Sequence, residues 1–241
     1  MRPWQTIDSL ETPEGKLELR QRGERDFLIT IGGRVLMTSA AHRSETALAR
    51  LACAPLKERP RAQVLIGGLG MGYTLRAALD ELHRTAHVTV VDLNQAVVSW
   101  CKGPLGVLTD NALADRRVRV VVADVARVIA AAAPGSYDAI VLDLYEGPHQ
   151  ATNRGSDPLY GRAALEKAAA ALRPGGVLAI WSEEPDHAFE IRMVAAGFKT
   201  TREAGGRGGR AHVIYLGVPN PRRKPEAKPG PKPARPRQTR R

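Results

Sequence analysis

Residues 64–76 read VLIGGLGMGYTLR, a short apolar run followed by closely spaced glycines and then by helix-forming residues. The apolar run predicts a buried strand, and Thr74–Leu82 predicts a helix. Three glycines lie between them in a G-x-G-x-G pattern: Gly68, Gly70 and Gly72. Glycines here let the backbone turn sharply and let a ligand approach the N-terminus of the helix. The order of strand, glycine loop and helix predicts a nucleoside-binding site.

The chain around this loop alternates strands and helices from about residue 61 to residue 217. The expected strands are short and apolar: Gln63–Ile66, Val88–Val91, Val118–Val122, Ala139–Leu142, Val177–Trp181 and Val213–Leu216. The expected helices are Thr74–Leu82, Gln95–Trp100, Val125–Ala133, Gly161–Leu172 and Asp186–Ala196. Such strands are typical of a parallel sheet covered on both faces. The predicted fold class is therefore α/β and Rossmann-like.

Two features modify this parallel sheet. Phe198–Arg202 and Ala211–Leu216 are joined by a glycine-rich segment, which predicts an antiparallel hairpin at one edge. Arg173–Gly176 predicts a sharp turn from a helix into the next strand.

The chain divides into three regions. Residues 1–57 are expected to form a small β region, with strands at Lys16–Arg20 and Phe27–Ile31 and a helix at Ser44–Leu51. Residues 58–217 are the expected Rossmann-like nucleoside-binding domain. Residues 218–241 are rich in Pro, Lys and Arg and are expected to be disordered.

Most of the net charge of +11 belongs to the last region, which has nine basic residues and one acidic residue. Such an arm could contact nucleic acid. It has no aromatic side chain to stack on bases, so a solvated, non-specific tail is favoured.

The composition favours a soluble protein of the cytoplasm. Hydrophobic residues make up 43% of the chain, enough for a packed core. Cys53 and Cys101 are the two cysteines, and both fall in expected helices, which favours buried thiols over a disulfide framework or a zinc site. No uninterrupted apolar stretch is long enough to cross a membrane. We therefore expect a soluble, cytoplasmic protein with neither a metal nor a membrane partner.

Acidic residues stand at the ends of three of the expected strands: Asp92, Asp124 and Asp143. The carboxyl ends of parallel strands meet at one edge of a sheet, where open α/β folds bind ligands. A carboxylate at Asp92 is placed to accept hydrogen bonds from a ribose diol, and Asp124 could accept one from the exocyclic amine of adenine. The alternative for Asp124 is that it caps the helix that follows.

The spacing of these residues leaves the ligand open between NAD and an adenosyl compound. Dinucleotide sites usually read G-x-G-x-x-G with an acidic residue about 20 positions later. Here the third glycine comes one residue early, yet Asp92 lies 20 residues after Gly72. The edge hairpin and the third acidic position favour an adenosyl-sulfonium ligand.

Residues 64–76 resemble, without a gap, the V-L-I-I-G-G-G-D-G-G-T-L-R loop of spermidine synthases, the polyamine aminopropyltransferases. Further similar segments are Val90–Asn94, Tyr137–Asp143 and Leu159–Leu178, and the resemblance covers roughly residues 25–200. It implies the class I S-adenosylmethionine-dependent methyltransferase fold and decarboxylated S-adenosylmethionine as co-substrate. It also implies an amine acceptor such as putrescine and leaves a homodimer open.

The resemblance also implies catalytic residues. The family's catalytic loops read D-S-x-D-P-x-G-P, and residues 143–148 here read DLYEGP. Asp143 stands at the position that orients and helps deprotonate the attacking amine, and Glu146 stands at the second acidic position. An amine needs this help because it is mostly protonated at pH 7 and then has no lone pair.

Two departures from the pattern keep other functions open. Met71 replaces the aspartate of G-G-G-D-G-G, which contacts the aminopropyl nitrogen in the family, and a thioether cannot pair with an ammonium. The family's Tyr-His-Glu segment and N-terminal glutamine have no clear counterparts, and Met37 stands near the place of the glutamine. The alternatives are an S-adenosylmethionine-dependent methyltransferase and a non-catalytic module that binds a nucleoside or nucleic acid.

Overall fold

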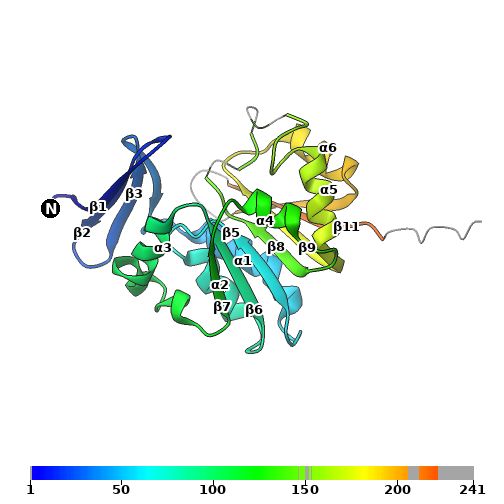
Figure 1. The fold of residues 1–241 in the computed structure, drawn as a ribbon, viewed down its shortest axis with the longest axis horizontal. Helices are drawn as coiled ribbons and strands as arrows, with labels where there is room; N and C mark the ends of the chain where they lie inside the picture. The colour runs from blue at the N-terminus through cyan, green and yellow to red at the C-terminus, as the bar shows by residue number, and fades with distance from the viewer. Residues whose placement is uncertain (1, 146, 150–151, 153, 206–211, 222–241) are drawn as a thin grey trace, which may run out of the picture.

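The computed structural model of the 241-residue chain describes residues 2–145, 147–149, 152, 154–205 and 212–221. Figure 1 shows a small N-terminal sheet beside a larger sheet covered by helices. The strands are β1 (Gln5–Thr12), β2 (Gly15–Arg22), β3 (Asp26–Ile31), β4 (Arg34–Thr38), β5 (Gln63–Gly67), β6 (His87–Asp92), β7 (Val118–Val122), β8 (Tyr137–Leu142), β9 (Leu172–Ser182), β10 (Phe198–Ala204) and β11 (Val213–Pro219). The α-helices are α1 (Arg43–Cys53), α2 (Tyr73–Glu81), α3 (Gln95–Lys102), α4 (Val125–Ala131), α5 (Arg162–Ala171) and α6 (His187–Ala195). Short 3-10 helices are η1 (Ala54–Leu56), η2 (Pro104–Leu108) and η3 (Ala112–Ala114).

The larger sheet has the strand order β10-β11-β9-β8-β5-β6-β7. Strands β5 to β9 pair in parallel, whereas β11 runs antiparallel to both β9 and β10. This confirms the predicted Rossmann-like sheet with an antiparallel hairpin at one edge. The loop of that hairpin, residues 206–211, lies outside the described residues, as does the part of the expected tail from residue 222 onward. The expected start of that tail at residue 218 is wrong, because Val218 and Pro219 belong to β11.

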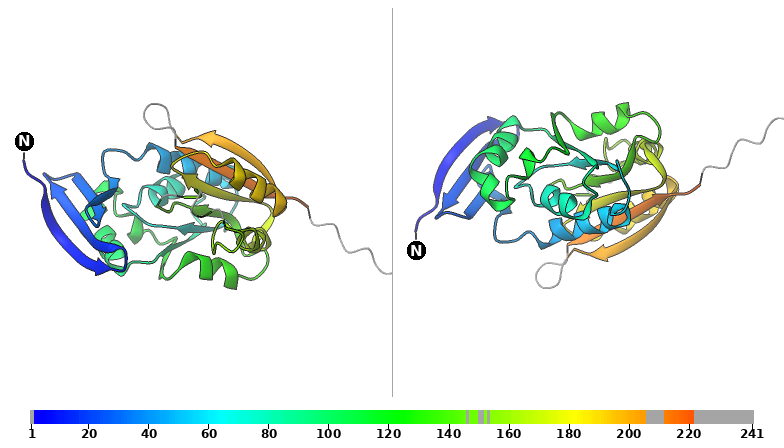
Figure 2. Two further views of the ribbon diagram at one scale, coloured as in Figure 1. Left: turned by 90° about the horizontal axis from the view of Figure 1, so that it is seen from above. Right: turned by 90° about the horizontal axis from the view of Figure 1, so that it is seen from below.

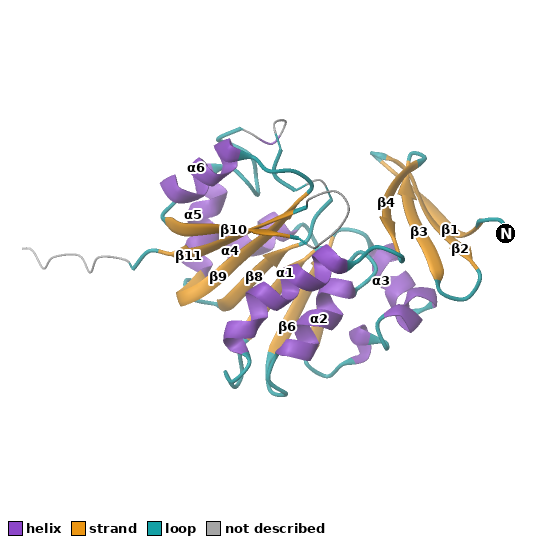
Figure 3. Ribbon diagram, turned by 180° about the vertical axis from the view of Figure 1, so that it is seen from behind, coloured by secondary structure: helices purple, strands orange, loops and turns teal. Residues whose placement is uncertain are grey.

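Each central strand sends alternate side chains into two separate cores. In β5, Val64 and Ile66 join the core of the α1, α2 and α3 side, and Leu65 joins the core of the α4, α5 and α6 side. Helices α4 and α5 lie in front of the sheet in Figure 1, and Figure 3 shows α1 and α2 on the opposite face. Burial on both faces explains why these strands are apolar throughout.

The N-terminal region forms a four-stranded antiparallel sheet in the order β1-β2-β3-β4. The sequence predicted two of these strands, and β1 and β4 were missed because their side chains are largely exposed or half-buried. Figure 2 shows this sheet at one end of the molecule, next to α3. The Trp100 indole nitrogen of α3 donates a 2.6 Å hydrogen bond to Asp8 of β1.

The expected turn at Arg173–Gly176 is instead part of β9. Helix α5 ends at Ala171 and the strand begins at once, so Leu172 pairs with Tyr137 and Val177 with Ala139. The residues between are accommodated as a bulge, in which Gly175 takes a positive φ of 78°.

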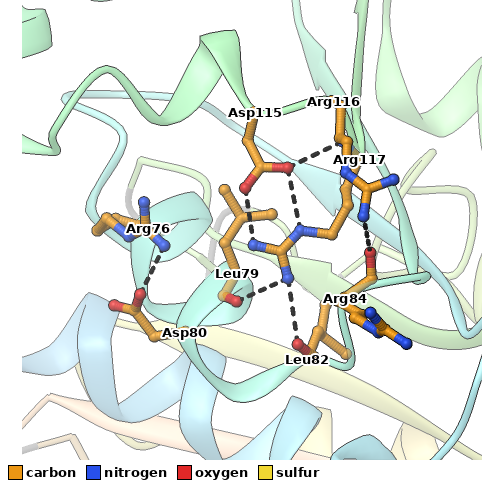
Figure 4. A network of polar contacts seen from close by, with 8 residues as sticks. All are labelled: Arg76, Leu79, Asp80, Leu82, Arg84, Asp115, Arg116 and Arg117. Atoms are coloured by element: carbon orange, nitrogen blue, oxygen red, sulfur yellow. Dashed lines mark hydrogen bonds and ion pairs between the residues drawn. The ribbon is translucent and has the colours of Figure 1, made fainter.

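A network around Arg117 joins the start of β7 to the end of α2 (Figure 4). The guanidinium donates to the backbone oxygens of Leu79 and Leu82, at 2.9 and 3.1 Å, and so satisfies carbonyls at the C-terminus of the helix. Asp115 accepts from the same guanidinium at 2.7 Å, and this hydrogen bond lowers the pKa of Asp115 to about 2.

The two cysteines, Cys53 and Cys101, are free and buried, as expected. Burial raises the thiol pKa of both to about 12, so neither is a reactive thiolate at neutral pH. Among the described residues, no helix combines the length and apolar character needed to cross a membrane.

Candidate active site

A cleft of about 430 Å³ opens at the carboxyl ends of β5, β6, β7 and β8. The strand order reverses between β5 and β8, and such a switch point is where open α/β sheets bind ligands. Five of the residues predicted from the sequence line this cleft: Gly68, Gly70, Asp92, Asp124 and Asp143. The opposite wall comes from the N-terminal sheet: Glu14, Leu17, Ile29, Ile31, Leu36 and Met37.

The glycine loop needs glycine because other segments of the protein lie close against its backbone. Gly68 has a φ of 89°, and a Cβ there would collide with the backbone oxygen of Asp143. Gly70 has a φ of 51°, and its Cβ would lie 2.9 Å from the Met37 sulfur. Gly72 has a φ of 84°, precedes α2 and faces Thr109 rather than the cleft. The loop thus offers its backbone to the cleft at the first two glycines.

Asp92 fastens the glycine loop to the end of β6. Its Oδ2 accepts a 2.9 Å hydrogen bond from the Leu69 backbone nitrogen, and its Oδ1 accepts a 2.8 Å bond from that of Asn94. Burial raises the pKa of this carboxyl, and the backbone hydrogen bonds oppose that rise. Each carboxylate oxygen can accept a second hydrogen bond, so Asp92 keeps acceptor capacity toward the cleft.

Asp124 is both a helix cap and a lining residue of the cleft. Its Oδ1 accepts a 2.8 Å hydrogen bond from the Ala126 backbone nitrogen, which caps α4. The capping alternative is therefore correct, but the side chain is exposed and lines the cleft. Asp124 and Leu159 also border a neighbouring hollow of about 260 Å³ between α4 and α5.

Asp143 follows β8 and is held against the glycine loop. Its backbone nitrogen donates a 2.8 Å hydrogen bond to Gly67, and its Oδ2 accepts a hydrogen bond from the Thr74 hydroxyl. Burial and the negative charge of Glu45 raise the pKa of Asp143 to about 7, against the lowering effect of the Thr74 bond. A carboxyl with this pKa can accept or release a proton near neutral pH.

Three residues beside Asp143 and the glycine loop were not predicted as site residues: Glu45, Thr74 and Met37. Glu45 lines the cleft from the first turn of α1. Thr74 comes from the first turn of α2, and Met37 from β4. The alignment of residues 64–76 with the family's glycine loop could have identified Thr74, because Thr74 lies two residues after Gly72, the last glycine of that loop.

Other predicted positions do not contribute a described side chain to the cleft. Glu146 lies outside the described residues. The Met71 side chain is fully buried in the core beside α2. Its backbone nitrogen donates a 3.3 Å hydrogen bond to the Met37 sulfur. Hence no thioether from position 71 lines the cleft. Tyr145, in contrast, lies two residues after Asp143 and does line the cleft; it is half exposed, with the Arg34 guanidinium 5.9 Å from its ring centre.

Within the described residues, no three His, Cys, Asp or Glu side chains are grouped so that they could hold a metal ion. The cleft offers backbone amides, carboxylates and apolar surface instead. This donor set fits a nucleoside that carries positive charge.

Comparison with protein families matches residues 46–195 to the model described as the spermine/spermidine synthase domain. Among curated proteins, polyamine aminopropyltransferase 2 of Pseudomonas aeruginosa is 32% identical over 134 residues, covering 54% of this chain and 36% of that protein. Putrescine N-methyltransferase 3 of Nicotiana tabacum is 33% identical over 126 residues, covering 52% of this chain and 30% of that protein. The chain thus spans about a third of the length of these relatives.

Among solved structures, spermidine synthase from Thermotoga maritima superposes with a TM-score of 0.70 at 19% identity, covering 89% of this chain and 72% of that one. A spermidine synthase in complex with the transition-state analogue AdoDATO gives a TM-score of 0.69, also at 19% identity. At this identity the likeness shows a shared fold.

Proposed function

Because this chain belongs to the spermine/spermidine synthase family, we propose that it transfers an aminopropyl group from decarboxylated S-adenosylmethionine to an amine such as putrescine. The observation that carries the proposal is the Asp143 carboxyl, which faces the cleft beside the glycine loop with a pKa of about 7. The acceptor amine must lose a proton to react, and a carboxyl of this pKa is matched to that task.

The reaction is a substitution at carbon. The amine nitrogen attacks the aminopropyl carbon bonded to the sulfonium sulfur, and the carbon–sulfur bond breaks. The electron pair of that bond neutralises the sulfur, which leaves as methylthioadenosine. Asp143 takes one proton from the protonated amine before the attack and orients the free amine in line with the breaking bond, and the product leaves as a secondary ammonium.

The nucleoside half of the donor fits the other predicted residues. The remaining acceptor capacity of Asp92 suits a ribose diol, and the carboxylate of Asp124, which lines the same cleft, would accept from the adenine amine. Gly68 and Gly70 leave room for the nucleoside against the loop backbone. Glu45 and Asp143 supply the negative charge that favours a cationic donor and a cationic acceptor.

A second candidate is methyl transfer from S-adenosylmethionine to an amine. It is favoured by Met71, whose position brings no carboxylate into the cleft to pair with the donor's amine. The similarity to a putrescine N-methyltransferase is about as high as that to an aminopropyltransferase. Both candidates share the same nucleoside site and the same base.

Calorimetric titration separates the candidates. The full chain is titrated with S-adenosylmethionine, with its decarboxylated form and with methylthioadenosine. We expect the decarboxylated donor to bind at least about tenfold more tightly than the carboxylated one, a difference of about 1.4 kcal/mol. Tighter binding of the carboxylated donor overturns aminopropyl transfer in favour of methyl transfer, and no binding of any of the three overturns both.

A further inference from the structure

A second concave site lies between α1 and α2, away from the cleft. It has a volume of about 330 Å³ and shares none of its lining residues with the cleft. Figure 3 shows these two helices side by side on the face opposite α4 and α5. The lining residues on which the site depends come from both helices and from the segments flanking the N-terminal sheet: Arg25, His42, Arg50, Tyr73, Arg76 and Asp80.

The lining is strongly basic. Three guanidiniums, those of Arg25, Arg50 and Arg76, face one carboxylate, that of Asp80. Asp80 pairs with Arg76 at 2.5 Å (Figure 4), and Arg50 pairs with Glu81 at 3.4 Å on the rim. Within the described part of the chain, Arg25 has no ion pair. The site therefore keeps an excess of positive charge.

The charge of Arg25 reaches the floor of the site. Burial raises the pKa of Tyr73, and the Arg25 guanidinium offsets part of that rise. The Tyr73 ring stacks on the His42 ring, with ring centres 4.1 Å apart, and its hydroxyl donates to the Ser39 backbone oxygen at 3.1 Å. The floor is thus a fixed pair of rings with arginines around it.

Two nitrogens in the wall of this site are buried without a hydrogen-bond partner among the described residues. They are Nδ1 of His42 and Nε of Arg76. A guanidinium Nε always carries a proton, and an imidazole Nδ1 can carry one, so both can donate. A buried donor without a partner costs about 1–3 kcal/mol, and both atoms are closed off from solvent here, so an acceptor reaches them only if the side chains turn toward the hollow.

We propose that this site binds a phosphate-type oxyanion, either free phosphate or the phosphate group of a small organic monoester. Planar guanidiniums bind phosphate oxygens through paired, charge-assisted hydrogen bonds, which explains three arginines around one hollow. A phosphate has oxygens enough to accept from the guanidiniums of Arg25, Arg50 and Arg76, all of which line the site. The site is open enough to admit the organic part of a monoester.

The test is calorimetric titration of the full chain with inorganic phosphate and, separately, with glycerol phosphate at constant ionic strength. Arg50→Ala removes a lining guanidinium, and Arg162→Ala is its matched control. Both arginines lie on helices and pair with a glutamate, and their side chains are 65% and 64% exposed. The double variant Arg25→Ala/Arg50→Ala removes both guanidiniums at the rim.

We expect saturable binding that weakens at least about fivefold in Arg50→Ala and further in the double variant, with no change in Arg162→Ala. Tighter binding of glycerol phosphate identifies an organic monoester as the occupant, and equal or weaker binding identifies free phosphate. No saturable binding, or equal weakening in Arg50→Ala and Arg162→Ala, overturns the proposal. Phosphate held by the basic tail does not imitate the expected result, because the tail is the same in every variant.

Discussion

The hydroxyl of Thr74 donates a hydrogen bond to Oδ2 of Asp143. Thr74 stands in the first turn of α2, directly after the glycine loop, and Asp143 directly follows β8. The bond therefore fixes the orientation of the proposed base relative to the proposed donor loop. Glu45 acts on the same carboxyl from α1, through its negative charge. Two neighbours thus move the pKa of Asp143 in opposite directions, and each can be removed separately.

Asp143→Asn should abolish turnover while leaving nucleoside binding within about threefold of the unaltered protein. An amide has nearly the shape of the carboxylate but cannot accept the proton of the amine, and general-base catalysis contributes about 10²–10⁴-fold. Initial rates and calorimetric titration with methylthioadenosine measure the two effects. Asp26→Asn, in the N-terminal sheet, is the control. Turnover that survives within a few-fold means that Asp143 is not the base.

Thr74→Val should move the acidic limb of the pH profile of kcat/KM to higher pH. The valine keeps the shape of the side chain but removes the hydroxyl that stabilises the ionised carboxylate, so the pKa of Asp143 rises above about 7. The variant should therefore lose several-fold in kcat/KM at pH 7 and recover at pH 9. Thr46→Val, which removes a hydroxyl bonded to a backbone oxygen in α1, should leave the limb in place.

Glu45→Gln should move the same limb to lower pH. Removing the neighbouring negative charge makes ionisation of Asp143 easier, so its pKa falls and the base stays active in more acidic solution. Profiles of kcat/KM measured in parallel with Thr74→Val should shift in opposite directions. A common direction for both variants would show that the limb reports a group other than Asp143.

Most strands of the larger sheet could be predicted because they are short and apolar and end at turn-forming residues. The polar strand β10 could be predicted only from the glycine-rich segment that follows it. Parallel topology then dictates that Asp92, Asp124 and Asp143 meet at one edge, since each lies at or just after the carboxyl end of a strand. The hydrogen-bond partners of these carboxylates could not be predicted from the sequence. Nothing in the residue pattern tells that both oxygens of Asp92 bind backbone amides of the loops.

The missed parts of the site depend on packing between segments distant in the chain. Glu45 comes to Asp143 because α1 packs against α2 and β8, and Met37 comes to Gly70 because β4 pairs with β3. The strand β1 was missed because its side chains are mostly exposed and show no two-residue period. Residue patterns report burial within one element and do not report which elements meet.

Gly68→Ala should be much more damaging than Gly70→Ala. At Gly68 the added Cβ meets the backbone oxygen of Asp143, which cannot move without shifting the end of β8. At Gly70 it meets the sulfur of Met37, the flexible part of a side chain that can turn away. We expect Gly68→Ala to lose nucleoside binding about a hundredfold or more, and Gly70→Ala about tenfold or less, by calorimetry. Equal losses would mean that the approach of the loop to Asp143 is not what requires glycine.

Asp138→Asn should destabilise the fold without touching the cleft. Asp138 is 1% exposed, and its Oδ2 accepts from the Gln63 backbone nitrogen at 2.7 Å and from Arg173 at 2.6 Å. Arg59 adds a second ion pair at 3.0 Å. A neutral amide leaves both guanidiniums without their counter-charge, at a cost of about 2–3 kcal/mol in the free energy of unfolding.

Urea unfolding of Asp138→Asn measures this cost, with Asp26→Asn as the matched control. Asp26 pairs with Arg22 on the surface at 3.1 Å, and its side chain is 48% exposed, so its loss should cost under about 1 kcal/mol. Nucleoside binding by the folded Asp138→Asn protein should be unchanged, because Asp138 lies at the opposite end of β8 from Asp143. A urea midpoint that falls no further than in the control would show that Asp138 does not anchor β5 and β9 to β8.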